Sequence, residues 1–388
     1  MFQRTKLLQN SHVNYHKSIS LQTLNSNFTN DTQDVEQQRC YPMRQKLCLH
    51  KQNFPIDIDL VAGLIVNTQK HSGEIPWCDG EKTDPWDHVE AAMGLSIGGY
   101  LREARRAYEW LAQIQLRDGS WYAAYVNGIP VDMTRDTNLS SYIAVGIFHY
   151  YLITGDLIFL RKMWPTIKSA INFVLELQAP DGEIYWAISP EGRIDSTALL
   201  TGSSSVYMSI KCALAIAELL NENMSMWGKG LVMLRHAIVN LPDRFNKDKF
   251  RYSMDWFYPI LSGALTGNKA QQRIEKFWDT FVIKNKGVRC VSDRPWVTVA
   301  ETCELSLALS AMGNRHLSEK VFGWIQNRTN SDGSYWCGFT CPDMTIWPKD
   351  KSTWTNAAVL IAADAIYKHT TAYRLFNHCF WNGAMHRI

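Results

Sequence analysis

The chain has 388 residues, of which 46% are hydrophobic and 20% charged, and its formal net charge is +3. This composition can fill a large core, and so weak a charge, with no basic stripe between aromatics, argues against nucleic acid as a partner. The nine cysteines form no tight framework, which favours free thiols in a reducing compartment and a cytoplasmic location. Cys337 and Cys341 lack a second Cys or His pair, so we expect no metal, and no motif calls for a cofactor.

The first 50 residues are rich in Asn, Gln, Ser and Thr and contain no apolar stretch typical of a signal peptide. We expect a poorly ordered polar arm over 1–50 and a single domain over 51–388. No apolar run reaches the roughly 18 residues of a membrane-spanning helix, so the sequence predicts no transmembrane segment.

Apolar residues at helical spacing predict about twelve helices along the chain. In chain order they cover 55–69, 85–97, 99–116, 138–154, 156–178, 204–221, 225–240, 257–266, 268–284, 300–312, 315–328 and 354–368. Short connections marked by glycine alternate with long loops, as expected for repeated helix pairs. The fold class predicted is all-α, an (α/α)6 toroid of six hairpins.

Helices that follow the long loops are expected to form the inner wall, because they are small and apolar, as in Ala91-Ala92-Met93-Gly94. These are 85–97, 138–154, 204–221, 257–266, 300–312 and 354–368. Their first residues would meet at one mouth of the ring, which is where we place the working site.

Four long loops carry a similar phrase, exemplified by Asp118-Gly119-Ser120-Trp121 and Asp332-Gly333-Ser334-Tyr335-Trp336. The related phrases are at 72–77 and 181–186. With the preceding Gln115 and Gln326, they resemble the QW repeats of terpenoid cyclases. Those enzymes, the protein prenyltransferase β subunits and the six-hairpin glycosidases are α/α toroids, so the resemblance implies this fold over about 55–368.

Further strings are similar to a bacterial family labelled prenyltransferase-like on the basis of its fold. They lie at 83–90, 200–205, 251–256, 288–293, 301–304 and 353–355. That family implies a fold and a dense site, but no substrate. The sequence departs from the toroids of known reaction, because it has neither the Asp-x-Asp-Asp acid of squalene-type cyclases nor a clear zinc and diphosphate site of prenyltransferases. The nearest string to the former is Asp57-Ile58-Asp59-Leu60.

Acidic residues gather where the inner helices are expected to begin, and glycosidic cleavage needs two carboxyl groups across a sugar. We predict three catalytic residues: Asp87, Asp255 and Glu301. The predicted substrate-binding residues are Trp86, His88, Trp121, Asp136, Trp256, Asp293, Trp296 and Asp343. The tryptophans would stack on sugar rings, and Asp343 would belong to a lid.

Each of these residues also has a structural interpretation. Asp84 before Pro85 is a typical helix N-cap with Asp87 completing a box, and Asp136 has the same character. Thr298 with Glu301 matches a capping box, and Asp255 could pair with Arg251. The loop tryptophans could instead plug the ends of helix pairs. Glu90 and Glu304 fall one turn further into their helices, where Glu304 could face the interior.

Three functions therefore remain open. The first is a carbohydrate-active enzyme of the six-hairpin glycosidase type, using paired carboxylates on a small-molecule or oligosaccharide substrate. The second is a prenyltransferase-like or terpenoid cyclase-like toroid acting on an isoprenoid. The third is a non-catalytic binding protein.

Overall fold

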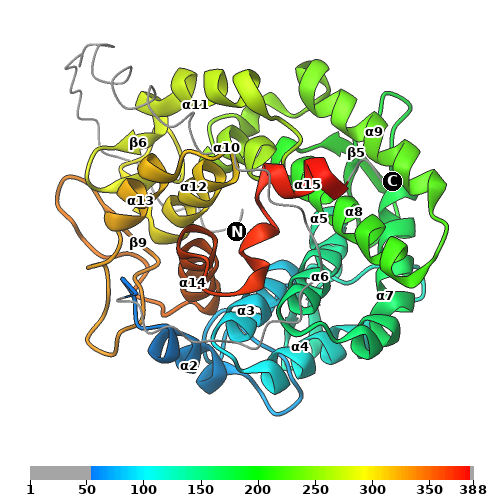
Figure 1. Ribbon diagram of the computed structural model, residues 1–388, viewed down its shortest axis with the longest axis horizontal. Helices are drawn as coiled ribbons and strands as arrows, with labels where there is room; N and C mark the ends of the chain where they lie inside the picture. The colour runs from blue at the N-terminus through cyan, green and yellow to red at the C-terminus, as the bar shows by residue number, and fades with distance from the viewer. Residues whose placement is uncertain (1–53, 385–388) are drawn as a thin grey trace. The chain divides into compact units, whose positions relative to one another are not determined.

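A computed structural model describes residues 54–384, and the polar arm expected over 1–50 lies outside them. Helices alternate along the chain between an outer and an inner wall (Figure 1). The outer helices are α2 (Ile58–Thr68), α4 (Leu101–Ile114), α7 (Leu157–Glu176), α9 (Ser225–Asn240), α11 (Gly267–Phe281) and α13 (Arg315–Gly323). The inner helices are α3 (Pro85–Ile97), α5 (Thr137–Ser141) continued by α6 (Ile143–Thr154), α8 (Leu200–Leu220), α10 (Ser253–Leu261), α12 (Val299–Ala311) and α14 (Thr353–Tyr367).

The inner helices pack side by side in the order α3, α6, α8, α10, α12 and α14, and α14 returns to contact α3, which closes the ring. Small residues permit this crowding. A Cβ atom added to Gly94 would lie 3.2 Å from the Ala357 Cα, and one added to Gly146 would lie 2.5 Å from a Val89 methyl. The helical toroid predicted from the sequence is therefore present, with the inner and outer walls as expected.

The all-α description is incomplete, because the long loops contain short antiparallel strands. These are β1 (Ala124–Val126), β2 (Ile129–Asp132), β3 (Arg135–Asp136), β4 (Tyr185–Ile188), β5 (Ile194–Ala198), β6 (Val282–Ile283), β7 (Gly287–Arg289), β8 (Trp296–Thr298) and β9 (Gly338–Thr340). They form three small sheets, β1-β2, β3-β4-β5 and β6-β7-β8-β9. Strands of two to five residues leave no period in the sequence. Strands β3 and β8 lead directly into α5 and α12, so the sheets brace the mouth of the ring.

The repeated loop phrases join neighbouring outer helices. In three of them a glutamine side chain donates both to the carbonyl of the glycine four residues on and to a carbonyl of the next outer helix. The pairs of acceptors are Gly73 and Glu103 for Gln69, Gly119 and Thr166 for Gln115, and Gly182 and Gly230 for Gln178. Gly119 has φ +91°, and a Cβ there would lie 2.2 Å from the Ser169 carbonyl oxygen, so only glycine fits. The phrase is thus an architectural device.

The far end of the ring holds a C-terminal segment that the sequence did not predict. It comprises η4 (Thr371–Arg374) and α15 (His378–Ala384), which lie within the ring in Figure 1. His378 Nε2 lies 2.7 Å from the Ile260 carbonyl oxygen, and the Trp381 ring packs against Phe148. The ring is therefore blocked at the C-terminal ends of the inner helices. Two 3-10 turns, η2 (Pro242–Arg244) and η3 (Lys247–Lys249), lie in the loop before α10.

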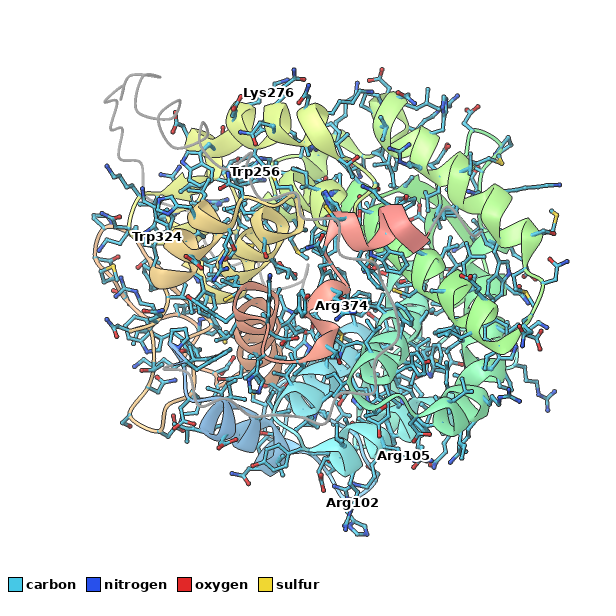
Figure 2. The ribbon with its side chains drawn as sticks, viewed as in Figure 1. Arg102, Arg105, Trp256, Lys276, Trp324 and Arg374 are labelled. Carbon is cyan, nitrogen blue, oxygen red and sulfur yellow. The ribbon has the colours of Figure 1, made fainter. Side chains whose placement is uncertain are left out.

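Within the described residues, α8 is long and apolar enough to cross a membrane, but 78% of its apolar window is buried in the ring. Its composition is that of a core helix. Side chains cover both walls of the ring, with charged groups such as Arg102 and Lys276 on the outside (Figure 2).

Candidate active site

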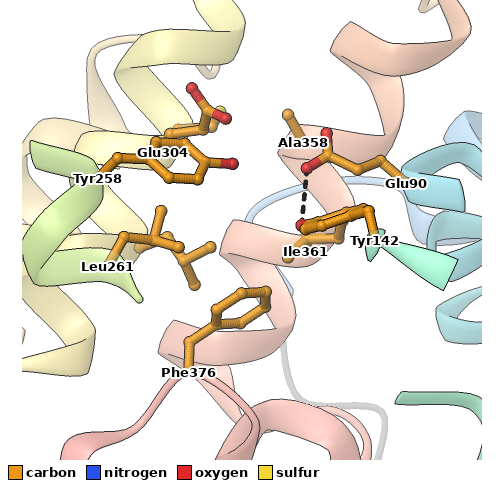
Figure 3. A pocket seen from close by; sticks show the side chains of 10 residues that line it. Glu90, Tyr142, Tyr258, Leu261, Glu304, Ala358, Ile361 and Phe376 are labelled. Carbon is orange, nitrogen blue, oxygen red and sulfur yellow. Dashed lines mark hydrogen bonds between the residues drawn. The ribbon is translucent and has the colours of Figure 1, made fainter. Parts of the chain in front are cut away.

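A narrow pocket with a free volume of about 10 Å³ lies inside the ring, below the first turns of the inner helices (Figure 3). Side chains from α3, α10, α12 and α14, with the residue between α5 and α6, form its wall. Its lining is Glu90, Tyr142, Tyr258, Leu261, Cys303, Glu304, Leu307, Ala358, Ile361 and Phe376. In the view of Figure 3 the polar groups lie above and the apolar groups below, against the C-terminal segment.

Helix α3 brings an acid and an aromatic ring to the pocket from one face. Trp86 Nε1 donates to Glu90 Oε1 at 2.9 Å, and the Trp86 ring lies 5.3 Å from that of Tyr142 and 5.5 Å from that of Tyr258. The spacing of four residues sets Trp86 directly above Glu90 on the helix. Trp86 itself is not among the side chains that line the pocket, so its contact with substrate stays a prediction.

Glu90 and Glu304 face each other across the pocket (Figure 3). They are 5% and 4% exposed. Glu90 Oε1 also accepts from the Tyr142 hydroxyl at 3.0 Å. Burial raises the pKa of Glu90 to about 7, against the opposing bonds from Trp86 and Tyr142. Burial, followed by the charges of Glu90, Glu301 and Asp87, raises the pKa of Glu304 well above its ordinary value, and the neighbouring Tyr258 hydroxyl opposes this.

Asp87 lies in the first turn of α3, half-buried and next to two other acids. Asp84 caps the helix by accepting from the Asp87 N–H at 2.9 Å, as its structural interpretation predicted, and also accepts from Trp77 Nε1 at 2.6 Å. Burial raises the pKa of Asp87 well above its ordinary value, and the charges of Asp84 and Glu90 add to the effect. The raised pKa favours the protonated form of Asp87 more than that of an exposed aspartate.

Glu301 occupies the first turn of α12, one turn before Glu304. Its carboxylate accepts a hydrogen bond from the Thr298 hydroxyl, so the two residues of the predicted box do meet. Burial raises the pKa of Glu301, while the hydrogen bonds from Thr298 and Cys290 favour its ionised form. Asp87 and Glu301, two of the three predicted catalytic residues, thus belong to one set of interacting acids with Glu90 and Glu304.

Asp255 lies on α10, where it ties this helix to α8. Its Oδ1 accepts from the Thr201 N–H at 3.0 Å and from the Thr201 hydroxyl. Burial raises its pKa to about 6. The salt bridge to Arg251 does not form, since Arg251 pairs with Asp293 on the surface. Asp255 does not line the pocket described above.

Three predicted binding residues turn toward the outer wall instead of the pocket. His88 Nδ1 accepts from the Ile75 N–H at 3.0 Å, and its Nε2 lies 2.9 Å from the Ala107 carbonyl oxygen on α4. Burial lowers the pKa of His88 to about 4, so the ring is neutral. Trp121 donates to the Leu111 carbonyl and Trp256 to the Arg273 carbonyl, and both are buried. These side chains fasten helix pairs, which corrects their assignment as pocket residues.

The other predicted binding residues lie in or beside the loops. Asp136 caps α5 by accepting from the N–H groups of the two residues that follow Thr137, and burial raises its pKa to about 6. Trp296 packs on Trp347 and donates to its carbonyl at 2.7 Å. Asp343 is exposed and accepts from the hydroxyls of two threonines. None of these three, nor Asp293, is among the side chains that line the pocket.

Four residues of the pocket are not among the catalytic or binding residues predicted from the sequence: Glu90, Tyr142, Tyr258 and Glu304. For the two glutamates a signal was available, because each follows a predicted catalytic acid by three residues and so shares its helix face. For the two tyrosines it was not, since nothing in the sequence distinguishes them from core aromatics.

No family model matches the chain. It is 46% identical over 315 residues to an MMP endo-(1,4)-3-O-methyl-alpha-D-mannosidase of Mycolicibacterium hassiacum, and the alignment covers 81% of this chain and 87% of that protein. An uncharacterised glycosyl hydrolase of Methanocaldococcus jannaschii is 29% identical over 45% of the chain and 28% of that protein.

Solved structures share the fold at low sequence identity. The GH63 mannosylglycerate hydrolase of Thermus thermophilus, in complex with glucose, aligns with a TM-score of 0.60 at 11% identity, over 78% of this chain and 99% of that one. A D-mannose isomerase aligns with a TM-score of 0.64 at 10% identity, over 80% and 96%. Since a hydrolase and an isomerase share it, the fold alone does not define the reaction.

The toroid, its pocket of carboxyl groups and the mannosidase relative together define a carbohydrate-active enzyme, a glycoside hydrolase of the six-hairpin type. More particularly, the chain belongs to the family of the Mycolicibacterium hassiacum MMP endo-(1,4)-3-O-methyl-alpha-D-mannosidase. The prenyltransferase-like label and the isoprenoid alternative find no support among these relatives.

Proposed function

We propose that this chain cleaves the linkage named for its relative, an internal α-(1,4) bond between 3-O-methyl-D-mannosyl units. The observation that carries the proposal is a set of four interacting acids with raised pKa values on α3 and α12: Asp87, Glu90, Glu301 and Glu304. Glu90 and Glu304 line the pocket, and Asp87 and Glu301 lie one helical turn above them. Identity of 46% over most of both chains supports the same substrate class.

Asp87 and Glu301 are the catalytic pair in this proposal. Both occupy first turns of inner helices, closer to the mouth than the two deeper glutamates. Burial and acidic neighbours favour the protonated form of Asp87, so in this proposal it is the general acid that protonates the leaving glycosidic oxygen. Glu301, whose ionised form is favoured by the Thr298 hydroxyl, acts on the other side of the sugar ring as base or nucleophile.

Aromatic side chains complete the site. Trp86, Tyr142 and Tyr258 form a connected cluster next to the acids, and their ring faces suit the apolar face of a pyranose. Burial among these rings also strengthens each charge interaction during the reaction.

The test is hydrolysis of a panel of mannosides, with products identified by mass spectrometry. We expect cleavage of 3-O-methylated α-(1,4) mannose oligomers at internal bonds, and its loss in Asp87→Asn and Glu301→Gln. The matched control is Asp332→Asn, the same chemical change in an exposed acid of a repeat loop. Failure to cleave any α-mannoside, or full activity in both site variants, would refute the proposal.

A further inference from the structure

Glu90 and Glu304 have a capacity for hydrogen bonds that the protein leaves unused. The Trp354 side chain lies within hydrogen-bonding reach of Glu90 and the Tyr258 hydroxyl within reach of Glu304, and each acts to lower the pKa of its acid. Among the residues that the structure describes, however, no group bonds to Glu90 Oε2 or to either oxygen of Glu304 in acceptable geometry. Both glutamates are nearly inaccessible and both point into the pocket (Figure 3). Buried acceptors without partners are costly, and native proteins keep few of them unless a ligand completes the set.

The chemistry of these oxygens defines what would complete them. A carboxylate accepts hydrogen bonds and prefers donors that reach it in pairs. The wall beside them supplies two tyrosine hydroxyls, one of which, Tyr142, is already bonded to Glu90. A pyranose carries neighbouring hydroxyl groups on a rigid ring, and two such groups would reach both glutamates at once.

The floor beneath the two acids is different in character. Leu261 and Ile361 line it, and Phe376 of the C-terminal segment closes it from below (Figure 3). These side chains carry no donor or acceptor, and the free volume of about 10 Å³ holds one methyl-sized group but not a sugar ring. They therefore match a methyl group better than a free hydroxyl.

We propose that Glu90 and Glu304 form the base of a sugar-binding subsite: they accept hydrogen bonds from two hydroxyl groups of one mannosyl unit that lies above the pocket, and its O-methyl group enters the pocket toward the apolar floor. This subsite lies one helical turn below Asp87 and Glu301, and it deepens the proposed function, on which it rests. The two glutamates determine specificity, and the bond-breaking step remains with the upper pair.

Binding to an inactive enzyme tests the subsite directly. The background is Asp87→Asn, and the probe is methyl 3-O-methyl-α-D-mannoside, measured by isothermal titration calorimetry. Adding Glu304→Gln or Glu90→Gln should weaken binding roughly 10- to 100-fold, because each replaces an accepting carboxyl oxygen with an amide NH2 group that can only donate. The matched control is Glu183→Gln, a buried loop glutamate with an unpartnered oxygen that does not line the pocket. It should leave the affinity unchanged.

Kinetics on the otherwise wild-type enzyme separate binding from chemistry. The same two substitutions should raise KM by a similar factor and reduce kcat less, as expected for groups that hold the substrate in both ground and transition states. Methyl α-D-mannoside, which lacks the O-methyl group, should bind several-fold more weakly than the methylated probe.

The outcomes discriminate between the two proposals. If the wild type cleaves the methylated substrate but both glutamine variants bind the probe like the control, the subsite is refuted and the proposed function stands. Tighter binding of the unmethylated sugar would refute the role of the floor. No cleavage of any mannoside by the wild type would refute the proposed function itself.

Discussion

Two sets of acids lie on the same ring and behave in opposite ways. In the repeat loops, Asp118 and Asp332 each accept from the serine two residues on and each pair with a cation, Arg135 or Lys351. Burial acts to raise the pKa of Asp118, but the serine and the arginine together hold it below its ordinary value. The Lys351 ammonium and the Ser334 hydroxyl lower the pKa of Asp332 to about 2.

The acids on α3 and α12 are surrounded differently. No cation is among the main influences on Glu90 or Glu304, burial dominates both, and their pKa values rise. The contrast teaches that the repeated loop phrase uses carboxylates as fixed, ionised acceptors that hold the architecture. The first two turns of the inner helices instead keep buried carboxyl groups whose pKa values are raised, that of Glu90 to about 7.

The largest expected effect separates the two sets by activity. Asp87→Asn and Glu301→Gln should each lower kcat by about 100- to 10,000-fold, because they remove the groups that exchange protons with the substrate. Asp118→Asn should leave kcat within a factor of about two of the wild-type value, because Asp118 holds a repeat loop and does not act on the substrate. Circular dichroism of each variant checks that folding is retained. A normal kcat in Asp87→Asn would contradict the distinction between catalytic acids on the inner helices and structural acids in the loops.

The structural role of the repeat loops can be tested at a glycine with a positive φ angle. Gly119→Ala should destabilise the protein by about 1–3 kcal/mol, since alanine at φ +91° is strained and its Cβ meets the Ser169 carbonyl. Gly128→Ala, also at positive φ but with open space around the Cβ, is the matched control and should cost less. Thermal unfolding measures both, and equal losses would contradict the close approach.

The site acids should carry a cost in stability that depends on pH. The pKa of Glu90 rises from 4.5 to about 7 in the folded state, so the folded protein holds this proton more tightly than the unfolded chain. Stability from this group therefore falls as pH rises from about 4.5 to 7. Glu90→Gln should raise the unfolding free energy by about 1–2 kcal/mol at about pH 8 and little at about pH 4. If the increase in unfolding free energy were the same at both pH values, improved packing and not the titration of Glu90 would explain it.

The smallest effect concerns the exposed pair of Lys351 and Asp332. The pKa of Asp332 is depressed from 3.8 to about 2, so the contribution of the pair is present above the unfolded value and is lost as pH falls toward 2. Lys351→Met should cost about 0.2–1 kcal/mol at about pH 7 and nothing at about pH 2, with no change in kcat. Denaturant titration at the two pH values checks this, and a larger loss would mean that the pair supports the mouth.

The ring was predictable because its helix pairs repeat and their connections alternate in length. The ranges 85–97 and 225–240 coincide with α3 and α9, whereas α10 begins at Ser253, before the expected 257. The short strands and the segment after Tyr367 escaped, because strands of a few residues have no period and α15 is defined by what it packs against. Both are products of tertiary contact.

The location of the site in the fold could be predicted from the sequence better than the identity of the residues that form it. Acids at the starts of inner helices pointed to Asp87 and Glu301, which the structure groups with Glu90 and Glu304. Position near the start of an inner helix also selected His88 and Trp256 as binding residues, but their side chains turn to the outer wall. Residues in one helix turn face opposite sides, and without the ring's orientation the sequence could not choose between them.

The most direct measurement is cleavage of a 3-O-methylated α-(1,4) mannose oligomer in ¹⁸O-labelled water, comparing the wild type with Asp87→Asn and Asp332→Asn. If the enzyme is a hydrolase that depends on Asp87, we expect one labelled oxygen at each new reducing end with the wild type and with Asp332→Asn. Asp87→Asn should give almost no product. Products without label, or equal cleavage by all three proteins, would contradict hydrolysis by the acids of α3 and α12.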